Sequence, residues 1–413
     1  KIGFLLRVVD ANAATAASKI AGSSYASSAS FDSTNDTLRR PEIEKADLVI
    51  SLLPPQLHLL VASDCLVLKK HLLTASYINQ DLQKMDPDIR SNDLLFLCEM
   101  GLDPGIDHMS AMALIDSIRH KKGIVNSFVS HCGGLVAPES DNNPWHYKIS
   151  WNPRNVVTAG QAGAVYRLNG ELVELSYQEL FAQENKVEID SVGQYGWYPN
   201  RDSLSYLSLY GLESANTFIR TTLRHPNFIR GWRNLIQLSL TKDEPEYQLS
   251  APTLTTAFSH HFERSNVLQV VSQLRKDDPL FDRQLAFLGA DDTTSLQSDN
   301  FTPAQLLQIA LEKKLRLEPT DRDMIIMLHE IGYHCMGKDR LIKSQLLVKG
   351  DDAIHTAMAK TVGLPLAIAG LLILQEKISL RGLQIPIHRE IYEPVLRQLK
   401  EEGIEFSEID QGL

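Results

Sequence analysis

The chain has 413 residues, more than one ordinary hydrophobic core holds, so its length predicts two domains, or two with an insertion. A composition of 43% hydrophobic and 22% charged residues is typical of a globular protein. The formal net charge of -10, with no basic run, argues against nucleic-acid binding, because that depends on clustered lysine and arginine.

Four cysteines lie far apart and form no C-x-x-C pair: Cys65, Cys98, Cys132 and Cys335. This spacing predicts buried, reduced thiols and a cytoplasmic protein rather than a disulfide framework. The longest apolar stretch, Val362 to Leu374, is too short to span a bilayer. We expect a buried helix there and no membrane partner.

Short apolar runs alternate with helical patterns in the first hundred residues. The runs "FLLRVVDA", "DLVISLLP", "HLLTASY" and "DLLFLCEM" predict buried parallel strands. Residues 13–21, 57–68 and 81–90 predict helices, and the Ser-rich "GSSYASSAS" at 22–30 predicts a polar loop. The order predicts a doubly wound, Rossmann-like α/β sheet, in which ligands bind beyond the carboxyl ends of the strands.

The pattern changes near residue 125, where strand-like segments such as "VNSFVSHCGGL", "AVYRLNGELVEL" and "DMIIMLHEIGY" are separated by loops. They predict an α+β domain with a mixed sheet, comprising residues 111–252 and 316–349. Residues 253–315 predict a helical insertion. The last helix, 355–376, and the tail are expected to return to the first domain, which would comprise 1–110 and 350–413.

Asp10 ends the first apolar run. In dinucleotide-binding units an acid there accepts hydrogen bonds from the adenosine ribose and disfavours a 2'-phosphate, so Asp10 favours NAD, with NADP as the alternative cofactor. The other interpretation is a helix cap, since an Asp or Asn before "ATAASKI" suits the free amides there.

The glycine fingerprint of such units is absent, because Gly3 and Gly22 are the only glycines before Gly101. We expect a strand and its glycine turn to precede Lys1; the alternative is a degraded cofactor site. Leu53 and Pro54 follow a predicted strand, and their backbone would line the nicotinamide side of a cofactor, unless Pro54 merely stops the strand.

Ser76 and Tyr77 also end a predicted strand, so both would face the ligand crevice, where Ser76 could reach the cofactor or the substrate and Tyr77 could donate to a substrate oxygen. An ordinary aromatic at a strand end is the alternative. In "EMGLDPGIDHM", Asp103 suits a helix cap, which leaves Asp107 and His108 at the crevice mouth. His108 would then give or take a proton, unless it belongs to a solvated helix start.

Three arginines stand in polar, aromatic-rich loops: Arg154, Arg201 and Arg224. Arginine binds carboxylates through two hydrogen bonds, so the three suit a substrate with several carboxylates, although any one could be a solvated surface residue. The segment "HEIGYH" does not predict a metal site. Its histidines, His329 and His334, are one residue too far apart for H-E-x-x-H and lie in a predicted strand.

Several long motifs closely resemble the saccharopine dehydrogenases that form glutamate: "EMGLDPGIDHMSAM", "CGGLVAPESDNNPWHYKISWNPRNVV", "TLRHPNF", "AKTVGLPLAIAGLLIL" and "IPIHREIYEPVL". The resemblance extends from about Val8 to the end of the chain. It implies a Rossmann domain built from both chain ends, a substrate domain with a mixed sheet, and a helical insertion.

The resemblance also implies oxidation of saccharopine by NAD or NADP and hydrolysis of the imine to glutamate and 2-aminoadipate 6-semialdehyde, or the reverse. It places Ser76, Tyr77, Asp103, Arg154 and Arg224 around this small-molecule substrate, with Asp103, Tyr77 or His108 handling protons. A homodimer paired through the second domain's sheet is expected. A polyamine enzyme similar to carboxynorspermidine dehydrogenase and a non-catalytic relative are the alternatives.

Overall fold

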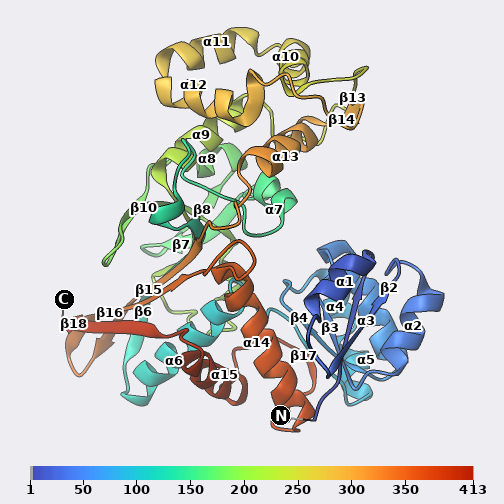
Figure 1. Ribbon diagram of the computed structural model, residues 1–413. Coiled ribbons are helices and arrows are strands. Elements are labelled where there is room, and N and C mark those ends of the chain that lie inside the picture. Colours follow the sequence, from blue (N-terminus) through green and yellow to red (C-terminus); the bar gives the residue numbers. More distant parts are fainter. Residues whose placement is uncertain (1–2, 413) are drawn as a thin grey trace. The chain divides into compact units, whose positions relative to one another are not determined.

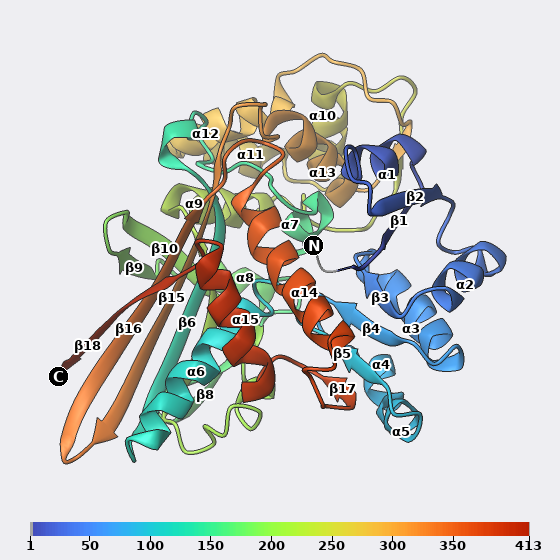
Figure 2. The ribbon, with the colours of Figure 1, turned by 60° about the horizontal axis from the view of Figure 1, so that its bottom comes forward.

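The apolar runs of the first hundred residues form short parallel strands. The computed structural model describes residues 3–412 and divides into a first unit, Lys1–Met109 with Val362–Gln398, and a second unit, Ser110–Thr361 with Leu399–Leu413. The first unit contains a parallel sheet of β3 (Leu48–Ser51), β4 (His71–Thr74), β5 (Leu95–Leu97) and β17 (Gly382–Gln384), in the order β17-β5-β4-β3. Figure 1 labels β3, β4 and β17, and Figure 2 also labels β5. The predicted parallel α/β sheet is confirmed.

Two further parallel strands form a separate sheet, β1 (Leu6–Asp10) and β2 (Ala26–Ser30), seen side by side in Figure 2. The prediction of a polar loop at residues 22–30 was wrong, because this segment contains β2. Serine and alanine carry little strand propensity. The strand exists because its backbone pairs with β1, in register from Leu6 with Ala26 to Asp10 with Ser30.

Helices separate the strands of the first unit. Those of its first segment are α1 (Ala13–Lys19), α2 (Asp36–Glu44), α3 (His58–Val67), α4 (Gln80–Lys84) and α5 (Asp86–Ser91). The sequence predicted one helix over 81–90, but Pro87, which has no N–H to donate, stands in the first turn of a separate helix. Helix α2 was not predicted; Asn35 caps it by accepting a hydrogen bond from the Thr37 amide.

A mixed sheet forms the second unit, as predicted. Its path is β11-β7-β12-β6-β15-β16-β18, and β6 is parallel to β12 but antiparallel to β15. The path comprises β6 (Ile124–Val136), β7 (Ala164–Leu168), β11 (Arg201–Asp202), β12 (Thr217–Arg224), β15 (Asp323–Cys335), β16 (Lys338–Lys349) and β18 (Phe406–Gly412). The long strands β6, β15 and β16 lie side by side in Figure 2. Off the path lie β8 (Glu171–Leu175), β9 (Lys186–Ile189) and β10 (Gly193–Pro199).

The end of the chain belongs to the second unit, whereas the sequence placed it with the first domain. Strand β18 pairs antiparallel with β16, and Asp410 accepts hydrogen bonds from Tyr333 at 2.9 Å and Arg340 at 2.9 Å. Most of this strand is exposed and polar. It therefore has no apolar pattern that would have identified its partner in the sequence.

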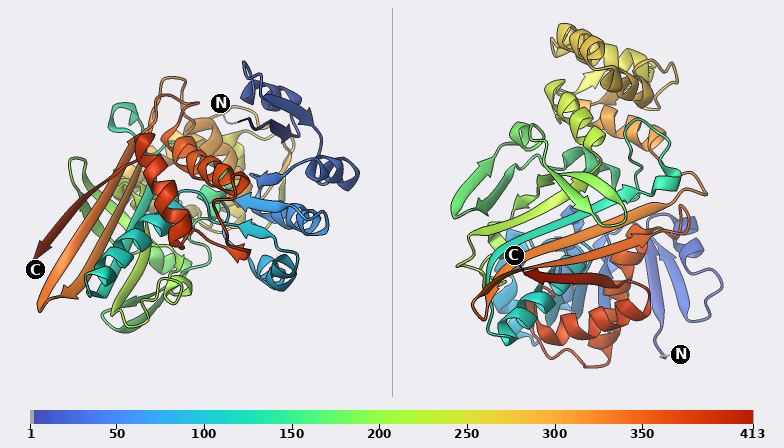
Figure 3. Two further views of the ribbon diagram at one scale, coloured as in Figure 1. Left: turned by 90° about the horizontal axis from the view of Figure 1, so that it is seen from below. Right: turned by 90° about the vertical axis from the view of Figure 1, so that its left-hand side faces the viewer.

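Helices dominate residues 254–314, as the sequence predicts (Figure 3). They are α10 (Leu254–Arg264), α11 (Leu268–Asp277), α12 (Pro279–Leu285) and α13 (Pro303–Lys314), with a small pair of strands, β13 (Tyr247–Gln248) and β14 (Asn300–Phe301). They share one buried core with α7 (Pro153–Thr158), α8 (Tyr177–Leu180) and α9 (Pro226–Gln237), and that core includes Trp145, Trp232 and Phe281. Helix α12 was not predicted.

One helix among the described residues, α14 (Ala357–Leu374), is long and apolar enough to cross a membrane by length and composition. The sequence predicted this helix over 355–376, and judged its apolar part from Val362 too short to span a bilayer; the helix comprises Ala357–Leu374. Half of its apolar window is buried, and Gly370 lies against Leu48, Ile50 and Leu73 of β3 and β4. This packing is that of a core helix. Two further helices are α6 (Ile106–His120) and α15 (Arg389–Glu401).

Candidate active site

Predicted site residues meet in the first unit beyond the carboxyl ends of β4 and β5. The Tyr77 hydroxyl donates a hydrogen bond to Asp103 Oδ1 at 2.9 Å. The two loops also bind each other through their backbones, because the Glu99 amide donates to the Ser76 carbonyl at 3.1 Å and the Met100 amide to the Thr74 carbonyl at 3.1 Å. The geometry therefore brings together three residues predicted from the sequence: Ser76, Tyr77 and Asp103.

A histidine that the sequence analysis missed holds Ser76. The His58 ring lies 2.8 Å from Ser51 Oγ through Nδ1 and 2.7 Å from Ser76 Oγ through Nε2. Burial lowers the pKa of His58, so the ring is neutral at pH 7. It thereby links the end of β3 to the loop after β4. The only signal in the sequence is its position in "SLLPPQLH", where His58 begins the helix that follows β3.

His108 is buried, whereas the sequence predicted it at the mouth of the ligand crevice. Its side chain is fully buried, with Nε2 2.9 Å from Glu99 Oε2 and Nδ1 3.6 Å from Asp107 Oδ2. Glu99 Oε1 accepts a hydrogen bond from the Ile78 amide at 3.1 Å. The sequence expected His108 to face a ligand directly, but in the structure its two ring nitrogens face carboxylates of the protein.

The turn "GLDPG" depends on its glycines. Gly105 has a φ of +145°, and a Cβ there would lie 2.1 Å from the Gly101 carbonyl oxygen, so no larger side chain fits. The Gly101 amide donates to the Pro104 carbonyl at 2.9 Å, and the Gly105 amide donates to Asp107 Oδ1 at 2.6 Å. This tight turn fixes where the Asp103 carboxylate points.

Of the residues predicted to hold a dinucleotide, Ser76 follows β4, and the other three, Asp10, Leu53 and Pro54, lie at or just beyond the carboxyl ends of β1 and β3. Asp10 ends β1 and accepts a hydrogen bond from the Asn12 amide at 2.7 Å, while Asn12 itself caps α1. Asn12, and not Asp10, therefore caps α1. Leu53 packs against the core of the first unit, and Pro54 precedes a short turn, Pro55–Leu57.

These residues fit the two ends of a dinucleotide better than its middle. Asp10, at the end of β1, would offer a carboxylate to ribose hydroxyls, and the loop after β3 would offer backbone to the nicotinamide side. Within residues 3–100 the only glycines are Gly3 and Gly22, so the described chain carries no glycine turn that lets backbone amides approach a pyrophosphate.

Arg224 is the predicted arginine with the clearest anion-binding environment. Arg224 is the last residue of β12 in the second unit and is 4% exposed. Its guanidinium carbon lies 5.2 Å from the ring centroid of Tyr147 and 5.8 Å from that of Phe228. One guanidinium nitrogen donates to the Leu223 carbonyl at 2.7 Å, whereas Nε is buried without a hydrogen-bond partner. A buried cation with an unused donor is what a carboxylate ligand requires.

The other two arginines differ from Arg224. Arg154, in α7, pairs with Asp243 through one terminal nitrogen, while the other is buried without a hydrogen-bond partner. It therefore also keeps a donor for an anion. Arg201 is exposed on β11, at the edge of the sheet beside Ala164 of β7. Its exposure favours the alternative interpretation, in which Arg201 is a solvated surface residue.

Two histidines next to Arg224 were missed by the sequence analysis. The rings of His146 and His225 stack with centroids 3.9 Å apart, and His146 Nδ1 lies 2.6 Å from Asp141 Oδ2. Burial, with the neighbouring His146, lowers the pKa of His225 to about 4, so His225 is neutral at pH 7. Both residues lie inside motifs that carry the resemblance, "SDNNPWHY" and "TLRHPNF", and this was the available signal.

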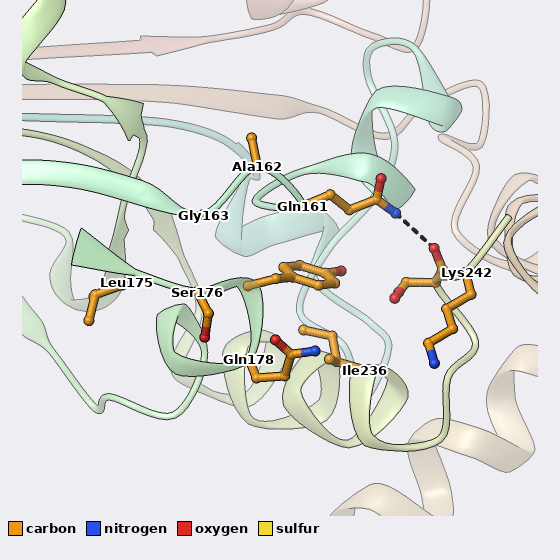
Figure 4. Close-up of a pocket in the computed structure, with 10 residues that line it drawn as sticks. Gln161, Ala162, Gly163, Leu175, Ser176, Gln178, Ile236 and Lys242 are labelled. Atoms are coloured by element: carbon orange, nitrogen blue, oxygen red, sulfur yellow. Dashed lines mark hydrogen bonds between the residues drawn. The ribbon is translucent and has the colours of Figure 1, made fainter.

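A pocket of about 440 Å³ lies elsewhere in the second unit (Figure 4). Its lining includes Gln161, Tyr177 and Lys242, and Gln161 Nε2 donates to the Thr241 carbonyl at 2.7 Å. None of the predicted substrate residues lines it. The pocket is therefore distinct from the surroundings of Arg224, because Arg224, Tyr147 and Phe228 do not line it.

The two histidines of "HEIGYH" lie in β15, as predicted. His329 is fully buried and lies 2.7 Å from Ser110 Oγ, whereas His334 is exposed and pairs with Asp339 at 2.8 Å. Their environments and partners differ, so the two rings do not share a metal-binding face. All four cysteines are free and buried, as expected.

Comparison with known proteins identifies the family. The saccharopine dehydrogenase NADP binding domain matches residues 4–97, and the saccharopine dehydrogenase C-terminal domain matches residues 101–404. The chain is 31% identical to the saccharopine dehydrogenase [NADP(+), L-glutamate-forming] of Pyricularia oryzae, over 94% of this chain and 90% of the relative. The enzyme of that name from Saccharomyces cerevisiae is 32% identical, over 92% and 88%.

Longer relatives and solved structures agree. The chain is 34% identical to the alpha-aminoadipic semialdehyde synthase of Arabidopsis thaliana, over 89% of this chain but only 37% of the relative, so it spans about two fifths of that protein. The structure of the apo saccharopine dehydrogenase (L-Glu forming) from Saccharomyces cerevisiae matches with a TM-score of 0.88 and 29% identity, over 100% of this chain and 95% of the other. A homospermidine synthase from Legionella pneumophila, at 8% identity and a TM-score of 0.55, shares the fold alone. The chain belongs to the saccharopine dehydrogenase family.

Proposed function

We propose that this protein oxidises saccharopine with a nicotinamide dinucleotide and hydrolyses the product to L-glutamate and 2-aminoadipate 6-semialdehyde, or catalyses the reverse reaction. The observation that carries the proposal is Arg224, a buried guanidinium with an unused donor. Saccharopine is a secondary amine with three carboxylates, and such a ligand supplies the missing anion. A polyamine substrate would need acids there instead, so the carboxynorspermidine-like alternative has less support.

The side chains have separate tasks in this reaction. A nicotinamide dinucleotide held by the first unit would supply the acceptor for the hydride that leaves the carbon next to the amine nitrogen. Arg224 and Arg154 hold carboxylates and so orient that carbon. The Tyr77–Asp103 pair takes a proton from the water that adds to the imine carbon, and returns a proton to the nitrogen as the C–N bond breaks. The products are an aldehyde and a primary amine.

The cofactor in this proposal is a nicotinamide dinucleotide, and the observations differ on whether it is NAD or NADP. The family description and the fungal relatives name NADP. Asp10, with no basic residue following it in "DANA", favours NAD instead.

The unpaired edges of β1 and β3 support a further parallel strand between them. Within residues 3–412 each of the two strands has one partner strand, and Leu6 and Ile50 are exposed. A glycine turn after that strand would bind the pyrophosphate.

The experiment is a nicotinamide absorbance assay with saccharopine and either NAD or NADP, using the chain together with any residues that precede it in its reading frame. We expect reduction of one dinucleotide and release of glutamate. Turnover with carboxynorspermidine but not with saccharopine would show that the substrate is a polyamine. If the protein binds neither dinucleotide, the hypothesis of a non-catalytic relative is favoured. A cytoplasmic location and a homodimer through the second unit's sheet remain predictions.

A further inference from the structure

The Tyr77–Asp103 pair is next to a buried network of polar side chains that the proposed reaction does not use directly. We propose that Glu99, His108 and Asp107 are positioning residues, which set the geometry of the Tyr77–Asp103 hydrogen bond. This inference rests on the proposed function, because it concerns the same site. It assigns the deepest polar residues of "EMGLDPGIDHM" to one task.

The network holds the Tyr77 side of the bond through Glu99. Glu99 Oε1 accepts from the Ile78 amide at 3.1 Å, and the Glu99 amide donates to the Ser76 carbonyl at 3.1 Å. Residues on both sides of Tyr77 are thus bound to one residue. Glu99 itself has a φ of +57°, a conformation that a non-glycine residue adopts only when its contacts enforce it.

The network holds the Asp103 side through Asp107. Asp107 Oδ1 accepts from the Gly105 amide at 2.6 Å, inside the turn that presents Asp103. His108 joins the two sides, with Nε2 2.9 Å from Glu99 and Nδ1 3.6 Å from Asp107. Glu99, Asp107 and His108 are 3%, 2% and 0% exposed, so water does not compete for these contacts.

Each nitrogen of the His108 ring thus faces a carboxylate of the protein. These contacts oppose rotation of the ring and tie together the two loops that carry Tyr77 and Asp103. The pair Tyr77–Asp103 is consequently preorganised before substrate binds, which is the condition for efficient proton transfer.

A double-mutant cycle tests the inference. We expect Glu99→Gln and His108→Gln each to lower kcat at least tenfold, with little change in the dissociation constant of the reduced dinucleotide. In a Tyr77→Phe background, which lacks the positioned bond, the same replacements should lower kcat no further. The matched control is His71→Gln, a half-buried histidine of the first unit that binds the Leu95 amide at 3.0 Å; it should leave kcat unchanged.

A measurement without turnover separates this inference from the proposed function. With tyrosine labelled at Cζ, the resonance that Tyr77→Phe removes should shift in Glu99→Gln and His108→Gln but not in His71→Gln. Additive losses in kcat, or an unmoved Tyr77 resonance, would overturn the positioning role. Unfolding of both network variants would also overturn it, since the network would then be structural. Wild-type protein that does not oxidise saccharopine refutes the proposed function alone, and the resonance still decides the inference.

Discussion

Arg224 shows how a single side chain can point to a ligand class. A guanidinium removed from water normally has a carboxylate partner, because an unpaired buried charge is strongly destabilising. Arg224 instead donates to one backbone carbonyl and stacks over two aromatic rings. The aromatic rings keep it in place and offset part of the lost hydration.

Replacing Arg224 with Met should raise the KM for saccharopine about 10–100-fold, since a charge-assisted hydrogen bond contributes about 1.5–3 kcal/mol. Methionine keeps the packing on Tyr147 and Phe228 but removes the charge. Steady-state kinetics with varied saccharopine measures this, and Arg316→Met, at an exposed arginine, is the control. A KM equal to that of the wild type would show that Arg224 binds no substrate carboxylate.

At the scale of elements, strands with a regular pattern of apolar residues could be predicted from the sequence, and strands that depend on pairing with a neighbour could not. The runs around β3, β4 and β5, and the alternation in β6 and β15, gave strands at the right places, because burial on one or both faces shapes the sequence. Strands β2 and β18 were missed, since each exists only through pairing with a neighbouring strand. The same limit applies to the site. Ser76, Tyr77 and Asp103 could be predicted because they follow the ends of strands, but the contacts of His58 and Glu99 are seen only in the folded structure.

Glu330 connects three strands of the mixed sheet. On β15, its carboxylate lies 3.5 Å from His131 Nε2 of β6 and 2.8 Å from Lys343 Nζ of β16. These two partners, His131 first, lower the pKa of Glu330 from 4.5 to about 2. Since the folded-state pKa lies below the unfolded one, the stabilisation is complete above about pH 4.5 and is lost as the pH falls towards 2.

We therefore expect Glu330→Gln to lower the free energy of unfolding by about 1–3 kcal/mol at neutral pH, and by progressively less between pH 4.5 and 2. Denaturant unfolding followed by tryptophan fluorescence measures the difference at each pH. Glu174→Gln, at an exposed strand glutamate on β8, should show no such trend. An equal loss at every pH would mean that the ionisation of Glu330 does not matter.

At the scale of the whole molecule, the two units are joined by helices rather than by loops. The three chain crossings fall between Met109 and Ser110 in α6, between Thr361 and Val362 in α14, and between Gln398 and Leu399 in α15. Unfolding one unit therefore breaks helices that the other unit also uses. This continuity argues for coupled stability, although each unit has a hydrophobic core of its own.

The tryptophans allow a direct test of this coupling, because all four lie in the second unit, at Trp145, Trp151, Trp197 and Trp232. A reduced dinucleotide bound by the first unit at one hundred times its dissociation constant stabilises that unit by about 2.7 kcal/mol. If the helices transmit this stabilisation, the denaturant midpoint of tryptophan fluorescence rises together with that of far-UV circular dichroism. A shift in circular dichroism alone would show that the units unfold independently, and that the continuous helices fray where the chain crosses between them.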